Sequence, residues 1–301
     1  MSFVKYYFVF LMCVFSVLTA GQTNSVQLKD GNGALISSHS SITEAYNSIP
    51  PVISQAYLIE IMPEYTTLNE IFPIEISPRV GSSAVNTITV RPAAGNSGEV
   101  ISRALNNNPI FNLSGVSYFI LDGRPGGIGD SSDLVIENSL NVGAKTNTIN
   151  LVDGASNNII MYIRAKSIPR SNAGPRNIYF HSSNTGNTTN NLIEFCEISG
   201  GRAGVSFEGQ AAGLSSGNII RKSKIFSFGL VGVWLIGSAE NTTIQACEIF
   251  QQETGLNTDF VGGIILTPSG ARGTTNIIGN KIYGMKHGSI SDTAQCWGIK
   301  G

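Results

Sequence analysis

The stretch Ile193-Glu194-Phe195-Cys196-Glu197-Ile198 is one of five similar stretches in this sequence, and together they decide the fold. Each has an aliphatic residue, two variable residues, a residue that is usually small, one more variable residue and an aliphatic or small residue. An Asn stands one to three residues before each stretch. The five stretches are 160–165, 193–198, 220–225, 244–249 and 277–282, and the Asn residues are Asn158, Asn191, Asn218, Asn241 and Asn276.

A second repeat lies between these stretches and consists of Gly, an aliphatic residue, a variable residue and a large apolar residue. It begins at Gly204, Gly232 and Gly263, and a further copy begins at Gly298. Successive copies of the first repeat are 33, 27, 24 and 33 residues apart. Two strand-like repeats in each unit of this length are typical of a solenoid. The period-2 alternation of apolar residues within them predicts β-strands, so we expect an all-β solenoid.

The composition allows a long core and argues against nucleic-acid binding. The 301 residues are 42% hydrophobic and 13% charged, with a formal net charge of −1. A nucleic-acid-binding protein would carry a basic surface, and this charge balance gives no basis for one.

The N-terminus has the form of a secretory signal peptide. Lys5 precedes the apolar run 6–18, and the small residues Thr19, Ala20 and Gly21 follow it. We therefore predict a signal peptide at 1–21, a secreted or cell-surface protein, and no membrane span after signal removal. A membrane-anchoring helix over the same residues is the alternative.

Two cysteines of the exported chain, Cys196 and Cys247, are predicted not to form a disulfide with each other. Cys196 and Cys247 occupy the same position of the repeat, with Ser223 at that position between them. Two stacked strands separate their Cα atoms by ~9.6 Å, whereas a disulfide needs less than ~7 Å. We expect the residues at this position, including Asn280, to form one stack with free thiols.

A short helix is expected before the repeats. Ser41 and Glu44 have the spacing of a capping box, and Ile42, Ala45 and Tyr46 then fall on one face. We predict a leader and N-terminal capping helix at 22–56 and a parallel β-helix at 57–301. Strands of the early coils are expected at 58–61, 74–76, 88–90, 119–121, 134–136, 149–151 and 178–180.

The repeats resemble the right-handed parallel β-helix repeats (PbH1 repeats) of the pectate-lyase-like superfamily, also described as the pectin-lyase-like fold. The order of signal, leader, helix, the stretches 86–92 and 118–123, and then the repeats is similar to large surface β-helix proteins of type IX-secreting bacteria. The resemblance implies a single-stranded right-handed parallel β-helix with a short N-terminal capping helix, on a bacterial cell surface.

The resemblance supplies one metal candidate. Glu194 stands where pectate lyases often carry an Asp that binds calcium, so Ca²⁺ is a possible cofactor. The catalytic acid and histidine set of polygalacturonases has no counterpart here. Charges also alternate at one outward repeat position, which favours a structural ladder over a catalytic site. This ladder consists of Arg164, Glu197, Lys224, Glu248 and Lys281.

Two long loops are better candidates for a site, because ligand sites on solenoids are built from loops on one face. The loops 250–262 and 283–297 should be stacked neighbours. Their acid/base candidates are Glu253, Asp259, Lys286 and His287, and their ligand-binding candidates are Gln252, Asn257 and Asp292. Solvated loops without a ligand are the alternative.

Two aromatic residues give a second candidate. Val233 and Leu235 should face inward, which turns Trp234 outward, and Tyr179 lies two coils away in the same column. An exposed aromatic column could stack on sugar rings. On that hypothesis Trp234→Ala weakens binding by ~1 kcal/mol or more with little effect on the melting temperature. A covering loop or a further segment of chain is the alternative.

The leading functional hypothesis is a secreted or cell-surface protein that presents a polysaccharide-binding, adhesin-like face to a cell-surface glycan. A polysaccharide lyase or glycoside hydrolase acting beside the two long loops is the second hypothesis, and a structural stalk is the third. The strand that begins at Gly298 stops before its second inward residue. Because solenoids avoid open ends, we expect further C-terminal coils or domains in the same protein.

Overall fold

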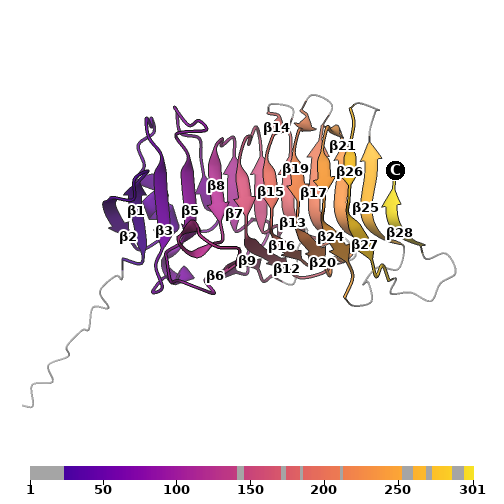
Figure 1. Cartoon of the computed structure of the whole chain (residues 1–301), viewed down its shortest axis with the longest axis horizontal. Helices are drawn as coiled ribbons and strands as arrows, with labels where there is room; N and C mark the ends of the chain where they lie inside the picture. Colours follow the sequence, from indigo (N-terminus) through magenta and orange to yellow (C-terminus); the bar gives the residue numbers. More distant parts are fainter. Residues whose placement is uncertain are drawn as a thin grey trace, which may run out of the picture.

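The computed structural model describes residues 24–140, 146–170, 174–183, 186–210, 213–252, 260–268, 273–286 and 295–301. They form an all-β parallel solenoid of about seven turns, in which successive coils stack along one axis (Figure 1). The all-β parallel β-helix expected from the sequence is confirmed.

Three long sheets form the faces of the solenoid. The parallel strands of the ten-stranded sheet are β3 (Tyr57–Ile61), β5 (Ile88–Pro92), β8 (Phe119–Asp122), β11 (Ile159–Met161), β15 (Leu192–Glu194), β19 (Ile219–Arg221), β23 (Thr243–Gln245) and β26 (Asn276–Ile278). The eight-stranded sheet contains β4 (Ile74–Ile76), β7 (Phe111–Ser114), β10 (Ile149–Val152), β13 (Arg176–His181), β17 (Ala203–Gly209), β21 (Val231–Gly237), β25 (Phe260–Pro268) and β28 (Gln295–Lys300).

The third face and the smaller elements complete each coil. The seven-stranded sheet contains β6 (Val100–Arg103), β9 (Leu134–Asn138), β12 (Ile163–Ser167), β16 (Glu197–Ser199), β20 (Lys224–Phe226), β24 (Glu248–Phe250) and β27 (Lys281–Tyr283). A three-stranded sheet contains β14 (Thr188–Thr189), β18 (Ser215–Ser216) and β22 (Ala239–Glu240), and the 3₁₀ turns are η1 (Thr67–Asn69) and η2 (Pro125–Gly127). All seven early strands expected from the sequence are present, while β6 and β7 were not expected.

The core is built by stacking the same repeat position of successive coils. Ile193 pairs with Ile220 and Ile220 with Ile244, and all three are buried. The second repeat stacks in the same way, with Val205 beside Val233. Each such side chain stabilises the fold by ~1.5–3 kcal/mol relative to exposure, which explains why the repeat sets the register.

The predicted stack of small residues is confirmed. The backbone N–H of Cys196 donates to Ser223 Oγ at 3.1 Å, and that of Cys247 donates to Asn280 Oδ1 at 2.8 Å. Both cysteines are buried and free. The small residues thus supply acceptors for backbone groups at the bend of each coil.

Three of the repeat asparagines form a buried ladder. Asn158 donates its backbone N–H and its Nδ2 to Asn191 Oδ1, at 3.0 and 2.9 Å. Asn191 makes the same two bonds to Asn218 Oδ1, both at 3.0 Å. Asn241 and Asn276 are exposed and lie outside this ladder, because Thr242 takes the equivalent place in the next coil.

The bend between the ten-stranded and seven-stranded sheets has one left-handed residue in each of five successive coils. In the first four of these coils the backbone N–H of this residue donates to a carbonyl of the next coil, as in the bonds from Tyr162 to the Glu194 carbonyl and from Lys222 to the Gln245 carbonyl. The five residues are Tyr162, Phe195, Lys222, Ala246 and Gly279.

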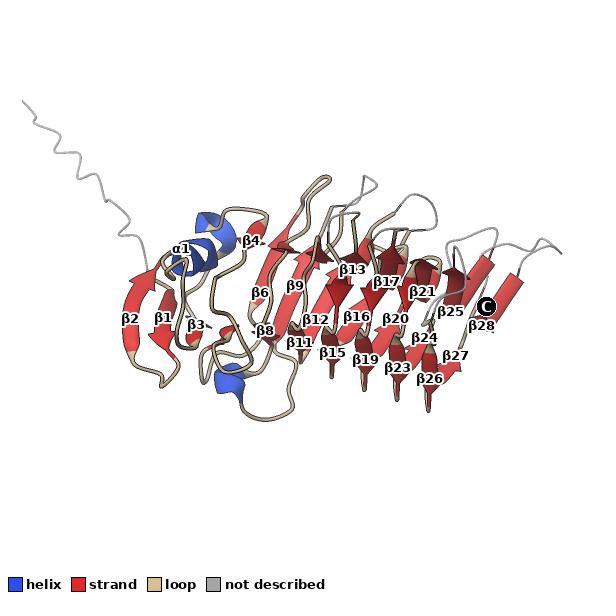
Figure 2. Ribbon diagram, turned by 90° about the horizontal axis from the view of Figure 1, so that it is seen from above, coloured by secondary structure: helices blue, strands red, loops and turns tan. Residues whose placement is uncertain are grey.

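The N-terminal end differs from the expectation for the leader. Two strands that were not expected from the sequence lie within 22–56: β1 (Val26–Asp30) pairs antiparallel with β3, and β2 (Leu35–His39) pairs with β1. The alternation of buried Val26 and Leu28 explains the strand. The expected helix is present as α1 (Ile42–Asn47), with Ser41 Oγ accepting from the Glu44 N–H, and it packs beside β1 and β2 (Figure 2).

Within the part of the chain that the structure describes, no helix has the length and hydropathy needed to cross a membrane.

Candidate functional site

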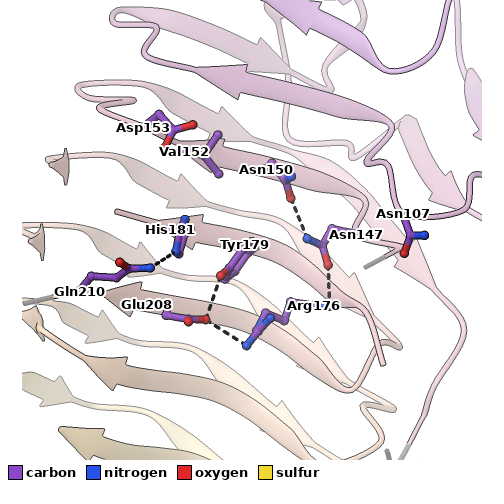
Figure 3. Close-up of a pocket in the computed structure, with 10 residues that line it drawn as sticks. All are labelled: Asn107, Asn147, Asn150, Val152, Asp153, Arg176, Tyr179, His181, Glu208 and Gln210. Atoms are coloured by element: carbon purple, nitrogen blue, oxygen red, sulfur yellow. Dashed lines mark hydrogen bonds and ion pairs between the residues drawn. The ribbon is translucent and has the colours of Figure 1, made fainter. Parts of the chain in front are cut away.

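A polar groove crosses the outer face of the eight-stranded sheet (Figure 3). Its volume is about 590 Å³, and it extends over β10, β13 and β17. The lining residues are Asn107, Asn147, Asn150, Val152, Asp153, Arg176, Tyr179, His181, Glu208 and Gln210.

The alternation of the strands brings these side chains together. In β13 Ile178 and Phe180 are buried in the core, which turns Tyr179 and His181 outward. The register then places Asn150 beside Tyr179 and Glu208 beside His181, although these residues are 29 and 27 positions apart in sequence. Parallel stacking therefore builds the groove from three coils.

Tyr179, Glu208 and Arg176 form a closed group. The Tyr179 hydroxyl donates to Glu208 Oε2 at 2.8 Å, and Arg176 Nη2 lies 3.0 Å from the same oxygen. The Arg176 guanidinium also lies over the Tyr179 ring, 4.6 Å from its centroid. Burial raises the pKa of Tyr179. The positive charge of Arg176 opposes this shift, whereas the negative charge of Glu208 and its hydrogen bond with the phenol add to it. The phenol therefore stays protonated at neutral pH.

Amide and imidazole groups line the rest of the groove. His181 stacks on Tyr179 with ring centroids 5.5 Å apart, and its Nε2 lies 3.1 Å from Gln210 Nε2. Asn147 Nδ2 donates to Asn150 Oδ1 at 2.8 Å. Such groups both donate and accept hydrogen bonds, which suits a ligand rich in hydroxyl groups.

The second predicted aromatic residue, Trp234, faces outward as expected but is only partly exposed. Its Nε1 donates to Thr267 Oγ1 at 3.1 Å, and its ring packs with the apolar side chains of Leu230, Val231 and Ile265. The Arg202 guanidinium lies 4.9 Å above the ring. Because Trp234 also contributes packing, the melting temperature alone would not separate binding from stability at this residue.

The structure does not bring the loop candidates together within its described residues. Gln252 and Lys286 are exposed, and the Ser227 hydroxyl is 3.5 Å from Gln252 Oε1. Glu253, Asn257, Asp259, His287 and Asp292 lie outside the described residues.

Glu194, the calcium candidate, is paired with an arginine. Arg221 Nε and Nη2 both lie 2.7 Å from Glu194 Oε2, on the adjacent strand of the ten-stranded sheet. Calcium binding at Glu194 stays a prediction, and it would require this guanidinium to move. Among the described residues no group of three or more His, Cys, Asp or Glu side chains is arranged to hold a metal ion.

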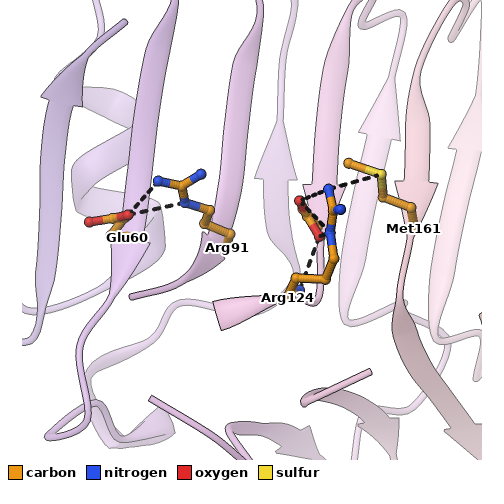
Figure 4. A network of polar contacts seen from close by, with 5 residues as sticks. Glu60, Arg91, Arg124 and Met161 are labelled. Atoms are coloured by element: carbon orange, nitrogen blue, oxygen red, sulfur yellow. Dashed lines mark hydrogen bonds and ion pairs between the residues drawn. The ribbon is translucent and has the colours of Figure 1, made fainter. Parts of the chain in front are cut away.

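Other acids on the outer face of the ten-stranded sheet are also paired with arginines (Figure 4). Glu60 Oε1 accepts from Arg91 Nε and Nη2 at 3.0 and 2.8 Å. Arg124 Nη2 lies 2.8 Å from Asp122 Oδ2 and also contacts Met161 Sδ at 3.8 Å. These acids are satisfied within the protein, so this face offers less to a ligand than the groove does.

The charge ladder predicted on the seven-stranded sheet is confirmed in register. Arg164 pairs with Glu197, Glu197 with Lys224, Lys224 with Glu248 and Glu248 with Lys281. Hydrogen bonds from the Tyr283 hydroxyl and Lys281, and the positive charge of Lys281, lower the pKa of Glu248. As expected, a carboxylate in this ladder is a poor general acid.

Sequence reasoning missed Arg176, His181 and Glu208. No local motif joins them, because Glu208 comes from a later coil than Arg176 and His181. The sequence does contain a signal that could have found them. Tyr179 and His181 alternate with inward residues, and aligning the outward positions of successive coils places Glu208 beside His181.

Models of known protein families and the curated proteins were compared with the chain, and neither comparison gave a match.

Proposed function

We propose that the groove on the eight-stranded sheet binds a polysaccharide and that the protein acts as a glycan-binding, adhesin-like surface. The observation that carries the proposal is the convergence of Asn150, Tyr179, His181 and Gln210 in one open groove across three coils. A polysaccharide is an extended ligand with many hydroxyl groups, and the groove offers donors and acceptors along the solenoid.

Binding is favoured over catalysis by the state of two titratable groups of the groove, Tyr179 and Glu208. A catalytic base must be able to lose its proton near the working pH, but burial raises the pKa of Tyr179. Glu208 is already held by Tyr179 and Arg176. These groups are therefore suited to fixing the shape of the groove.

Export to the cell surface is part of this proposal. The charged residue, apolar run and small residues at the N-terminus support a signal peptide. The β-helix repeats support kinship with the pectate-lyase-like superfamily and with surface proteins of type IX-secreting bacteria. A long, rigid solenoid would hold its glycan-binding face away from the cell.

A polysaccharide lyase or glycoside hydrolase is the second candidate. Its support is that a tyrosine, a histidine, an arginine and a carboxylate share the groove, since these residue types serve as acids, bases and charge-stabilising groups. Release of sugar fragments would favour this candidate over the binding proposal.

The test is affinity electrophoresis and calorimetry against neutral and acidic polysaccharides, with product release measured with and without Ca²⁺. We expect binding without turnover. Combining Asn150→Ala with His181→Ala should remove two hydrogen-bonding groups, worth ~1–3 kcal/mol together, and so weaken binding roughly 5- to 150-fold.

Two matched controls use the other faces of the solenoid. Gln245→Ala with Asn276→Ala removes exposed amides from the ten-stranded sheet and should leave binding unchanged. Tyr283→Phe removes a hydroxyl that donates to Glu248 at 2.8 Å, matching Tyr179→Phe, which removes the bond to Glu208. Equal effects of the groove variants and the controls would refute the location of the site.

A further inference from the structure

Arg202 carries a positive charge that no described carboxylate neutralises. It immediately precedes β17, and its guanidinium lies over the Trp234 ring. Arg176, in the preceding coil, has Glu208 as its ion-pair partner. Among the described residues, Arg202 forms no ion pair and its Nε is buried without a hydrogen-bond partner.

The environment makes this charge unfavourable without a ligand. Burial, and then the positive charge of Arg176, lower the pKa of Arg202. A guanidinium nevertheless remains protonated in proteins. A partly buried, unpaired cation therefore costs free energy, which a bound anion would recover.

A second polar group without a partner lies in β17, the strand that Arg202 precedes. Ser206 is fully buried, and its Oγ has no hydrogen-bond partner in the described part of the chain. The register places Ser206 between Tyr179 and Trp234 in the outward column of the eight-stranded sheet. Ser206 and Arg202 are thus both neighbours of Trp234, Ser206 through strand register and Arg202 through its contact with the ring.

We propose that Arg202, held against Trp234, is an anion-binding subsite for a carboxylate or sulfate group on the bound glycan. This inference rests on the proposed glycan-binding function and deepens it, since it states which chemical group the glycan carries. The planar guanidinium presents paired N–H donors that match the two oxygens of either group. The Trp234 ring holds the cation in place through its π face.

The first experiment examines the subsite without any glycan. Trp297→Phe leaves Trp234 as the only tryptophan, because the chain has two. Sodium sulfate and sodium acetate are titrated against sodium chloride at equal ionic strength, and Trp234 fluorescence is recorded. We expect saturable changes with sulfate or acetate that are absent when Arg202→Met is added.

Arg202→Met keeps an unbranched side chain over Trp234, and an unchanged melting temperature would show that the fold is retained. Arg202→Lys keeps the charge but loses the paired donors, so it should bind the anion more weakly than the parent. Fluorescence that responds equally to all three salts, or equally with and without Arg202, would overturn the subsite.

The second experiment uses matched polymers. Polygalacturonate is compared with its methyl ester, and dextran sulfate with dextran, so that each pair differs only in the anionic group. We expect at least one charged polymer to bind tenfold or more tightly than its neutral partner, and Arg202→Met to abolish the difference. The first pair reports a carboxylate and the second a sulfate.

Lys300→Met is the matched control, because Lys300 is also a cation over an indole ring, 3.7 Å from the Trp297 centroid. It should leave the preference for the charged polymer intact. If neutral polymers bind through Asn150 and His181 while Arg202→Met changes nothing, the subsite is wrong and the glycan-binding function stands. If sulfate binds at Arg202 but no polymer binds, the glycan-binding function fails instead.

Discussion

Replacing Asn191 with Ala should destabilise the solenoid more than any exposed Asn replacement. Asn191 Oδ1 accepts two hydrogen bonds from Asn158, and its Nδ2 donates to the Ala155 carbonyl and to Asn218 Oδ1. The residue is 1% exposed, so water cannot replace these partners without entering the core.

The expected loss in the free energy of unfolding depends on which polar groups the substitution leaves without any hydrogen-bond partner. The backbone N–H of Asn158 loses its acceptor in a buried position, which costs ~1–3 kcal/mol. The other three bonds contribute ~0.5–1.5 kcal/mol each, although Asn158 Nδ2 keeps its bond to the Val116 carbonyl and the Ala155 carbonyl keeps one from Thr189. We expect a loss of about 3–6 kcal/mol in the free energy of unfolding.

The assay is equilibrium urea unfolding followed by circular dichroism, with thermal melting as a second measurement. Asn276→Ala is the control, because Asn276 is exposed and its Nδ2 makes one long bond of 3.4 Å to Thr243 Oγ1. It should change stability by ~0.5 kcal/mol or less. A loss below ~1 kcal/mol for Asn191→Ala would show that the ladder does not hold the coils as described.

Two further predictions concern the thiols and the helix cap. In folded protein comprising 22–301, iodoacetamide should modify Cys296 alone, because burial raises the pKa of Cys196 to about 12 and also raises that of Cys247; mass spectrometry showing a Cys196–Cys247 disulfide would contradict the stacking. Hydrogen bonds from the Ser40 hydroxyl and N–H lower the pKa of Glu44 from 4.5, so its stabilising contribution is present above pH 4.5 and is lost as pH falls through the lowered folded-state pKa. Wild type should therefore exceed Glu44→Gln in melting temperature at neutral pH, with a gap that closes in acid, and a gap that stays constant down to about pH 3 would refute this role.

Much of the fold could be predicted because inward positions repeat. Ile193, Cys196 and Ile198 sit at fixed spacing, and burial of one apolar position in every coil leaves a single register that buries them all. The strands β1 and β2 were missed because their polar residues dominate the composition of 22–40. Only Val26 and Leu28 among the β1 residues are buried, which is too short an alternation to distinguish from a leader.

The candidate site was predicted less well, since outward positions have no common chemistry. Tyr179 was identified because the repeat places it in the same outward column as Trp234. Arg176 and Glu208 were not, because their ion pair depends on which coil lies next to which and on the conformation of two long side chains. The partial cover of Trp234 by Arg202 is likewise a contact between coils that local sequence does not reveal.

At the bend between the ten-stranded and seven-stranded sheets, the same left-handed backbone conformation occurs with different side chains. Its conformation costs a residue other than glycine about 1–3 kcal/mol, yet Tyr, Phe, Lys, Ala and Gly follow one another there. The bend is held by backbone bonds to the next coil, so the side chain is not what makes the chain turn. Five different residue types can therefore occupy this line of positions, one per coil, while the turn itself stays the same. Where aromatic residues follow one another, as at Tyr162 and Phe195, their rings stack along the solenoid axis at 4.7 Å.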